Sequence, residues 1–145
     1  MEFKNILVPV AGTDADDEAL VLACRLSKKN KSKIWSVYVI TIERTLPLEA
    51  EIESEIQKAE GILTHAEEMA EQEDCKVQTD VLQARDAGPA IIDEAVERGA
   101  DLIVMGIEYK KHFGQFSLGD VVPYVLKNAP CQVILHQKRS QAARL

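Results

Sequence analysis

The segment Asp101-Leu102-Ile103-Val104-Met105-Gly106 is an apolar run that follows one acid and ends in glycine. A strand of this composition has no polar side for water, so it suits a place buried on both faces of a sheet. The stretches Phe3–Val10, Lys33–Ile40 and Cys131–His136 are similarly apolar or β-branched, and Lys76–Gln83 is a weaker example. These runs predict five strands of a parallel sheet that is covered by helices.

Segments with helical periodicity lie between the predicted strands. The expected apolar stripes of the first two helices are Ala19, Leu22, Ala23 and Leu26, and Ile52, Ile56, Ala59, Leu63, Ala66 and Ala70. Thr13 or Asp14 is expected to cap the first helix and Asp120 the last, which spans 121–128. Pro89, after Gly88, is expected in the first turn of the third helix, which Gly99 closes. Four helices alternating with five strands predict an open α/β fold with right-handed crossovers.

The composition indicates one globular domain that does not bind nucleic acid. The chain has 145 residues, 46% of them hydrophobic, and a formal net charge of −7. Ten acids against Lys58 alone lie between Glu49 and Asp74, a pattern typical of the solvated face of a helix. Because no basic stripe with interleaved aromatic residues occurs, binding to DNA or RNA is not expected. No stretch approaches 18 apolar residues, so neither membrane insertion nor secretion is expected.

The three cysteines favour a reducing, cytoplasmic setting. They are odd in number, far apart and in no CxxC pair, so neither a disulfide framework nor a zinc site is expected. We expect Cys24 and Cys131 to be small core residues, and Cys75 to lie at a helix-to-strand junction where it can be exposed.

Ligands of open parallel sheets bind at the carboxyl ends of the strands. The loop Gly106–Asp120 runs from such a strand end to the start of a helix, and it contains Lys110, Lys111 and His112. Free N–H groups at a helix start attract anions, and the basic side chains add positive charge, so a phosphate site is one interpretation. The alternative interpretation is a solvated turn that happens to contain two lysines.

No enzyme is expected. The sequence has no GxxxxGK[ST], GxGxxG, HExxH or GxSxG pattern, which leaves P-loop, dinucleotide, zinc and serine chemistry without their defining spacing. Ser117 is expected to be a turn or capping residue, and the histidines His65, His112 and His136 to have surface or capping roles. Asp93 and Glu94 are expected to be ordinary acids in the first turn of the third helix.

Three segments together resemble the universal stress protein family, namely Asn5–Val10, Ala100–Gly106 and Val125–Ile134. The resemblance covers about residues 3–137. It implies one domain over 1–137, followed by a polar tail over 138–145, and a sheet with the strand order 3-2-1-4-5. It also implies a homodimer through the last strand, Cys131–His136.

One branch of that family binds ATP with the pattern G-x2-G-x9-G-[ST] after the fourth strand. Gly106 and Gly119 match the pattern, whereas Tyr109 and Asp120 replace its middle glycine and its hydroxyl residue. Ala11 replaces the aspartate usual after the first strand, and Ala84 stands where glycine is frequent. A side chain at Tyr109 limits close backbone approach, and a carboxylate at Asp120 repels phosphate. These departures predict an altered nucleotide preference.

We therefore expect a non-catalytic sensor of an adenine nucleotide, which would be ATP, AMP or a cyclic nucleotide. The adenine is expected against Val10, Val39 and Met105, with phosphate near Lys110, Lys111 or His112. The residues expected to form the site are Val10, Ala11, Gly12, Val39, Met105, Gly106, Tyr109, Lys110, Lys111, Ser117, Leu118, Gly119 and Asp120. No metal is expected to be required.

Two other functions are open from the sequence. One is a nucleotide-free dimeric module that regulates a membrane transporter, because Gly88–Ile91 and Leu118–Val125 resemble family domains appended to bacterial amino-acid transporters. The acidic helix argues against direct attraction to anionic lipid, so this function needs a protein contact. The other is a redox-responsive protein that uses Cys75.

Overall fold

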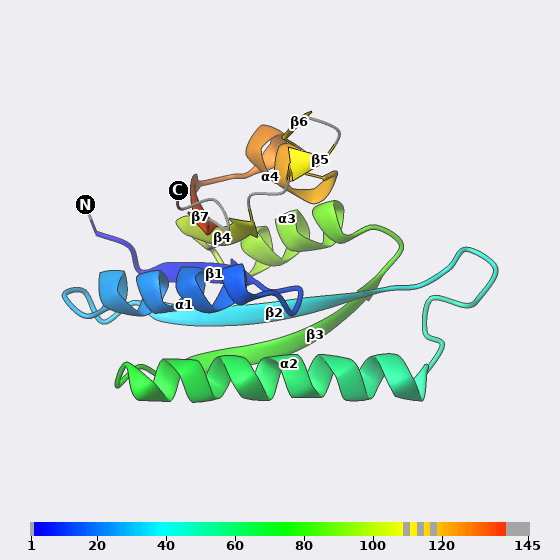
Figure 1. The fold of residues 1–145 in the computed structure, drawn as a ribbon, viewed down its shortest axis with the longest axis horizontal. Coiled ribbons are helices and arrows are strands. Elements are labelled where there is room, and N and C mark those ends of the chain that lie inside the picture. The colour runs from blue at the N-terminus through cyan, green and yellow to red at the C-terminus, as the bar shows by residue number, and fades with distance from the viewer. Residues whose placement is uncertain (1, 109–110, 113–114, 117–118, 139–145) are drawn as a thin grey trace.

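A computed structural model describes residues 2–108, 111–112, 115–116 and 119–138 of the chain. Strands and helices alternate along it (Figure 1). The elements are β1 (Asn5–Pro9), α1 (Asp14–Ser27), β2 (Lys33–Thr41), α2 (Glu53–Gln72), β3 (Val77–Ala84), α3 (Ala87–Glu97), β4 (Leu102–Glu108), β5 (Lys111–His112), β6 (Gln115–Phe116), α4 (Val121–Asn128) and β7 (Gln132–Lys138).

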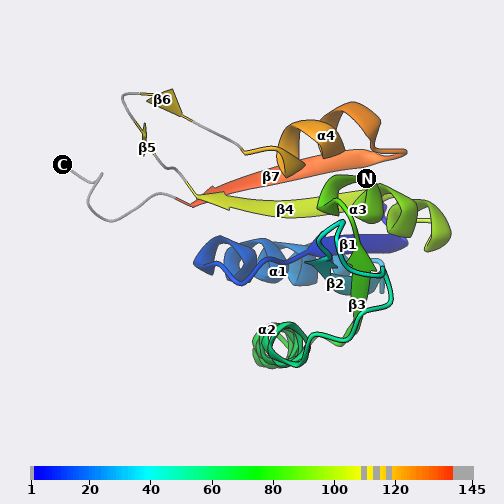
Figure 2. The same cartoon turned by 90° about the vertical axis from the view of Figure 1, so that its right-hand side faces the viewer.

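Five parallel strands form one sheet in the order β3-β2-β1-β4-β7, which confirms the expected strand order 3-2-1-4-5 (Figure 2). The central strands are the most apolar ones, β1 and β4, where Ile6 pairs with Leu102 and Leu7 with Ile103. All four of these side chains are fully buried. The apolar run at residues 102–105 is therefore continuous because both of its faces are covered.

Two apolar cores lie on opposite faces of the sheet. One joins α1 and α2 to the sheet and contains the expected alanines of both helices, Ala19 and Ala23 together with Ala59, Ala66 and Ala70. The other contains Ile91 and Ala95 of α3 with Val122 and Val125 of α4. Side chains that alternate along each strand enter the two cores in turn.

The helix ends follow the expected capping residues. Thr13 is the N-cap of α1 and Asp120 that of α4. After α3, Gly99 has φ +62°, and the N–H of Ala100 donates to the carbonyl of Ala95 over 2.8 Å. This is the Schellman ending that glycine favours.

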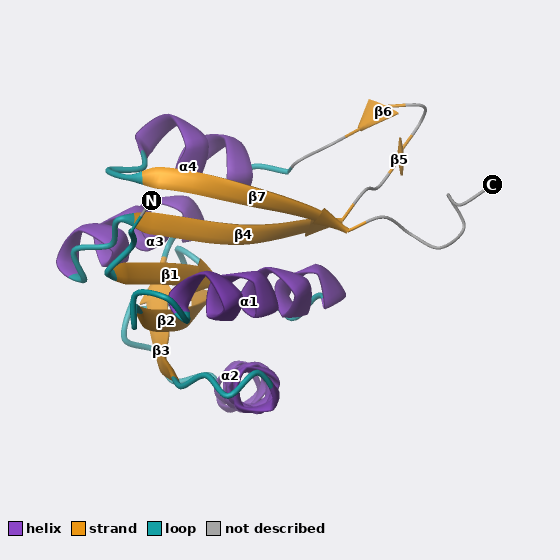
Figure 3. Ribbon diagram, turned by 90° about the vertical axis from the view of Figure 1, so that its left-hand side faces the viewer, coloured by secondary structure: helices purple, strands orange, loops and turns teal. Residues whose placement is uncertain are grey.

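Three local predictions were wrong. Asp93 and Glu94 do not lie in the first turn of α3, because that helix already begins at Ala87. The expected strand Cys131–His136 starts one residue later and continues through Lys138. The loop after β4 contains the short antiparallel pair β5 and β6, which lies beyond the carboxyl end of β4 (Figure 3). Strands of two residues show no periodicity from which they could be predicted.

Candidate functional site

The loop after β1 is organised around one carboxylate. The backbone N–H groups of Ala11, Gly12 and Thr13 donate to Oδ2 of Asp16 over 2.8, 2.8 and 2.9 Å. Asp16 is only 7% exposed, and this burial raises its pKa against the opposing effect of the amide donors. The loop thus supplies its own anion, and these three amides are not available to a phosphate.

The three residues expected to hold adenine do not form one surface. Val39 and Met105 belong to the core on the α3 and α4 face, whereas Val10 belongs to the core on the α1 and α2 face. Side-chain alternation along parallel strands causes this division. An adenine ring on Val39 and Met105 would therefore meet Val10 through its backbone alone.

Gly106 has a packing role in the structure. A Cβ atom built on it would lie 2.1 Å from the carbonyl oxygen of Ala15, in the first turn of α1. Only glycine lets β4 approach the start of α1 this closely. Gly12, which has φ +94°, likewise lies against Ile62 of α2.

The connection from β4 to α4 brings the remaining described site residues to the same end of the sheet. Gly119 has φ +71°, and the exposed Asp120 follows it as the N-cap of α4. The backbone of Lys111 lies in β5, opposite Phe116 of β6. The expected site residues Tyr109, Lys110, Ser117 and Leu118 lie outside the described residues.

The end of β3 holds the long loop between β2 and α2 in place. Nη1 of Arg85 donates to the carbonyls of Ile42, Glu43 and Leu46, and Nε2 of Gln83 donates to those of Leu48 and Ala50. Ala84, which stands where glycine was expected, lies between them in β3. These hydrogen bonds fasten the loop to the carboxyl end of β3.

Ion pairs that the sequence analysis missed join α1 to β7 and to α2. Glu18 lies 2.9 Å from Nε2 of His136, and Lys138 lies 3.6 Å from both Asp14 and Glu18. Asp17 lies 3.0 Å from Nε2 of His65 on α2. The paired residues are 48 to 124 positions apart in the sequence, so no local spacing pattern could predict these ion pairs.

A cavity of about 230 Å³ lies between α1 and α2, on the side of the sheet opposite to Val39 and Met105. Its walls include the expected site residues Val10 and Gly12, together with Leu20, Ile62 and His65. The sequence analysis did not predict a hollow on this face.

The family whose pattern matches this chain is the universal stress protein family, over residues 2–136. The chain belongs to that family. A universal stress protein of Methanocaldococcus jannaschii is 33% identical over an alignment of 142 residues, and the match covers 94% of this chain and 83% of that protein. The resemblance that the sequence predicted is thereby confirmed.

Solved universal stress proteins share the fold. The protein from Archaeoglobus fulgidus in complex with dAMP has a TM-score of 0.74 at 22% identity, covering 93% of this chain and 98% of its own. A universal stress protein in complex with cAMP has a TM-score of 0.68 at 15% identity, and the match covers 94% of this chain and 98% of that one. An Arabidopsis thaliana family protein with AMP bound has a TM-score of 0.66 at 14% identity, and the match covers 97% of this chain and 94% of that one. At these identities the likeness shows the fold alone.

No helix among the described residues is both long enough and apolar enough to cross a membrane.

Proposed function

We propose that this universal stress protein domain is a non-catalytic regulatory module that binds an adenine nucleotide at the carboxyl ends of its strands. One observation carries the proposal: the half-buried Val39, at the end of β2, lies on the same face of the sheet as Met105 and as α4, which begins at Val121 after its N-cap Asp120. Structural relatives that contain AMP, dAMP and cAMP support it. Adenine would lie on the apolar strand ends, and phosphate would lie near the start of α4.

The two loops at this end favour a ligand with few phosphate charges. The amides after β1 are occupied by Asp16, so phosphate must be held by the connection between β4 and α4. That connection contains Lys110 and Lys111, but also the exposed carboxylate of Asp120. A carboxylate repels a triphosphate more strongly than a single phosphate. We therefore expect AMP or a cyclic nucleotide to bind more tightly than ATP.

Native mass spectrometry and thermal unfolding with millimolar ATP, AMP or cyclic AMP test this proposal. A ligand at about 100 times its Kd stabilises a protein by about 2.7 kcal/mol, which raises Tm by several degrees. We expect a discrete adduct with AMP or cyclic AMP and a corresponding rise in Tm. If none of the three nucleotides protects the protein at millimolar concentration, the proposal fails.

A matched pair of variants locates the phosphate. Lys110→Ala with Lys111→Ala removes two charges from the connection before α4, and we expect binding of phosphate-bearing ligands to weaken at least tenfold. Lys28→Ala with Lys29→Ala removes the same charge from exposed positions just after α1, at the other end of the sheet. Equal weakening by both pairs would indicate a general charge effect and would contradict the proposed phosphate position.

We further propose that the domain forms a homodimer through β7. Val133, Ile134 and Leu135 remain partly exposed at this edge, whereas their register partners Ile103, Val104 and Met105 in β4 are buried. Three successive half-covered apolar residues on an edge strand suit coverage by a second chain.

A nucleotide-free interaction module that regulates a membrane transporter is the second candidate function. The occupied amides after β1 and the apolar edge at β7 favour it. Exposed Tyr124 and Leu126 on α4 would add to a protein contact. Capture of the tagged protein from detergent-solubilised membranes tests this function, and recovery of no transporter would count against it.

A further inference from the structure

Two cysteines far apart in the sequence meet at one corner of the fold. Cys24 lies in the last turns of α1, and Cys75 lies in the turn between α2 and β3. Cys24 is fully buried, and Cys75 is partly buried and packs against the core cluster that contains Cys24. This corner is at the amino ends of the strands, away from the proposed nucleotide site.

Ser27 links the two cysteines. Its hydroxyl donates to the backbone carbonyl of Cys24 over 2.7 Å, and its Oγ lies 3.9 Å from Sγ of Cys75. Since the single hydroxyl hydrogen is directed at the carbonyl, the thiol of Cys75 is the donor in the second contact. Burial is the main cause that raises the pKa of the Cys24 thiol, and a side-chain hydrogen bond to Cys75 raises it further. Cys24 and Cys75 are therefore neighbours around Ser27, at the edge of one core cluster.

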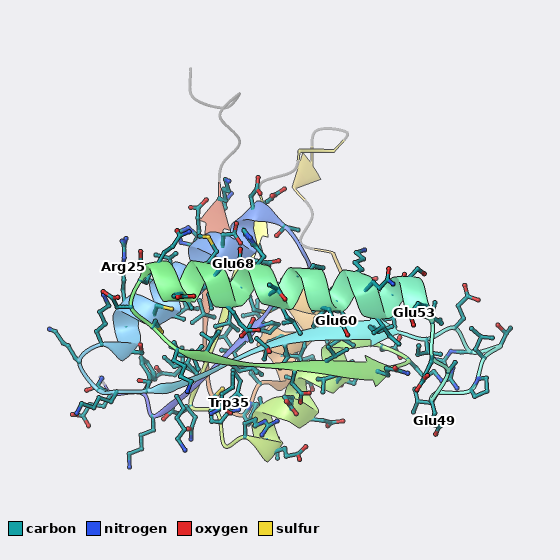
Figure 4. All side chains as sticks on the ribbon, turned by 90° about the horizontal axis from the view of Figure 1, so that it is seen from below. Arg25, Trp35, Glu49, Glu53, Glu60 and Glu68 are labelled. Atoms are coloured by element: carbon teal, nitrogen blue, oxygen red, sulfur yellow. The ribbon has the colours of Figure 1, made fainter. Side chains whose placement is uncertain are left out.

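The surrounding backbone holds the two segments together. Arg25 pairs with Glu73 over 3.1 Å, one residue from Cys24 and two from Cys75, and Arg25 lies beside this end of α2 (Figure 4). The N–H of Cys75 donates to the carbonyl of Ala70 over 2.9 Å. The preceding residue, Asp74, has φ +53°, the left-handed conformation that ends α2 before the chain enters β3. The contacts of Arg25 with Glu73 and of Ser27 with Cys75 thus hold the end of α1 beside the turn before β3.

We propose that Cys24 and Cys75 form an intramolecular disulfide when the protein meets a peroxide. Cys75, the more accessible thiol, reacts first as its thiolate: its sulfur attacks hydrogen peroxide, the O–O bond breaks, and hydroxide leaves. The sulfur of Cys24 then attacks the Cys75 sulfenic acid, the S–S bond forms and water leaves. In sum, two thiols lose two electrons and two protons, and one peroxide becomes two waters. The raised pKa of Cys24 makes the second step slow at neutral pH.

The bond would join the end of α1 to the turn before β3. These positions are 51 residues apart in the chain. Closing a loop of that length restricts the unfolded chain, so the oxidised protein is expected to unfold at a higher temperature, by about 5 °C or more. Because the corner lies away from the strand carboxyl ends, nucleotide binding is expected to be unchanged.

The full-length protein, treated with hydrogen peroxide and then with an alkylating reagent, tests the proposal. The expected result is a loss of about 2 Da, one alkylated thiol remaining at Cys131, and a proteolytic fragment that joins Cys24 to Cys75. Dithiothreitol should restore three alkylated thiols. Gain of oxygen at Cys75 without a cross-link, or a covalent dimer on a non-reducing gel, would overturn the proposal.

Three variants serve as controls. Cys75→Ser and Cys24→Ala should each abolish the loss of 2 Da and the rise in Tm, whereas Cys131→Ser should leave both unchanged. Cys75 is only partly buried, so its variant remains informative if Cys24→Ala fails to fold. A cross-link that persists in Cys75→Ser would also overturn the proposal. Nucleotide binding that fails in the reduced protein would refute the proposed function and leave this inference intact.

Discussion

At the scale of single residues, two glycines of this chain have opposite roles. Gly106 has no room for a Cβ atom, because the backbone of α1 lies against it, whereas nothing lies within 4 Å of a Cβ atom built on Gly61 of α2. The family pattern places Gly106 in the nucleotide motif. Its packing against Ala15 supplies a structural reason for glycine that holds with or without a ligand.

Gly106→Ala is expected to lower the free energy of unfolding by about 1–3 kcal/mol, because backbone atoms must move to admit the methyl group. Gly61→Ala is the matched control and should raise it by about 0.5–1 kcal/mol, since alanine is the better residue inside a helix. Urea unfolding of both variants measures these changes. Equal stability of Gly106→Ala and the parent would contradict the close approach of β4 to α1.

His65 on α2 is a histidine whose pKa the fold raises. Its hydrogen bond to Asp17, and then the charge of Asp17, raise its pKa above the ordinary 6.5. A raised pKa means that the folded state holds the proton more tightly. The stability from this pair is complete below pH 6.5 and is lost as the pH rises through the folded pKa. The pair is exposed, so this contribution is about 0.5 kcal/mol or less.

NMR titration of the His65 ring is the direct measurement. We expect its pKa to fall toward 6.5 in Asp17→Asn, because Asp17 is the main cause of the raised value. An unchanged pKa of His65 in that variant would show that Asp17 is not its partner in solution.

At the scale of elements, α3 is attached to the sheet by a charged contact as well as by its apolar face. Glu94 is 5% exposed, and burial raises its pKa. Arg98 lies 3.3 Å from both Glu94 and Asp80 of β3, and its guanidinium lies 5.6 Å from the centre of the Trp35 ring. One arginine thus joins α3 to β2 and β3.

Arg98→Ala is expected to destabilise the protein more than Glu94→Gln, because it leaves a buried carboxylate without a cation. The double variant should be less destabilised than the sum of the two single variants, since glutamine needs no cation. Unfolding followed by Trp35 fluorescence reports the contact directly, because Trp35 is the single tryptophan of the chain. Strict additivity would indicate that the two side chains do not interact.

At the scale of the whole molecule, the sheet has two edges that differ in what they leave uncovered. The edge at β3 is fastened to the loop before α2 by Arg85 and Gln83. The edge at β7 exposes part of Val133, Ile134 and Leu135. Acids such as Glu53, Glu60 and Glu68 are exposed along α2, so this helix carries negative charge away from β7 (Figure 4). Electrostatic repulsion between two copies of the chain is therefore expected to be weaker at β7 than at α2.

If the proposed dimer forms through β7, Val133→Lys is expected to convert it to a monomer, because a charge on an edge strand opposes pairing of that edge. Val81→Lys places the same charge on the opposite edge strand, β3, and should leave the dimer intact. Light scattering after gel filtration measures the mass of each variant. A dimer that persists in Val133→Lys would place the interface elsewhere.

The fold and the candidate site differ in how far the sequence predicts them. The alternation of strands and helices, the caps at Thr13 and Asp120, and the ending at Gly99 follow from local periodicity and backbone preference, so they could be predicted. The strand order was predicted from the resemblance to the family, because the spacing of residues along the chain does not determine which strands are neighbours. The β5 and β6 pair was missed because two-residue strands have no period, and the face of Val10 was missed because adjacent strand ends were treated as one surface.

The sequence by itself determined the class of fold and the acidic surface of α2. These depend on contacts between near neighbours and on composition, which the order of residues records directly. The tertiary structure alone decided that Cys24 meets Cys75, that Glu18 meets His136 and that Arg98 covers Trp35. Each of those contacts depends on strand order and on the helix crossovers, which bring together residues that no sequence period connects.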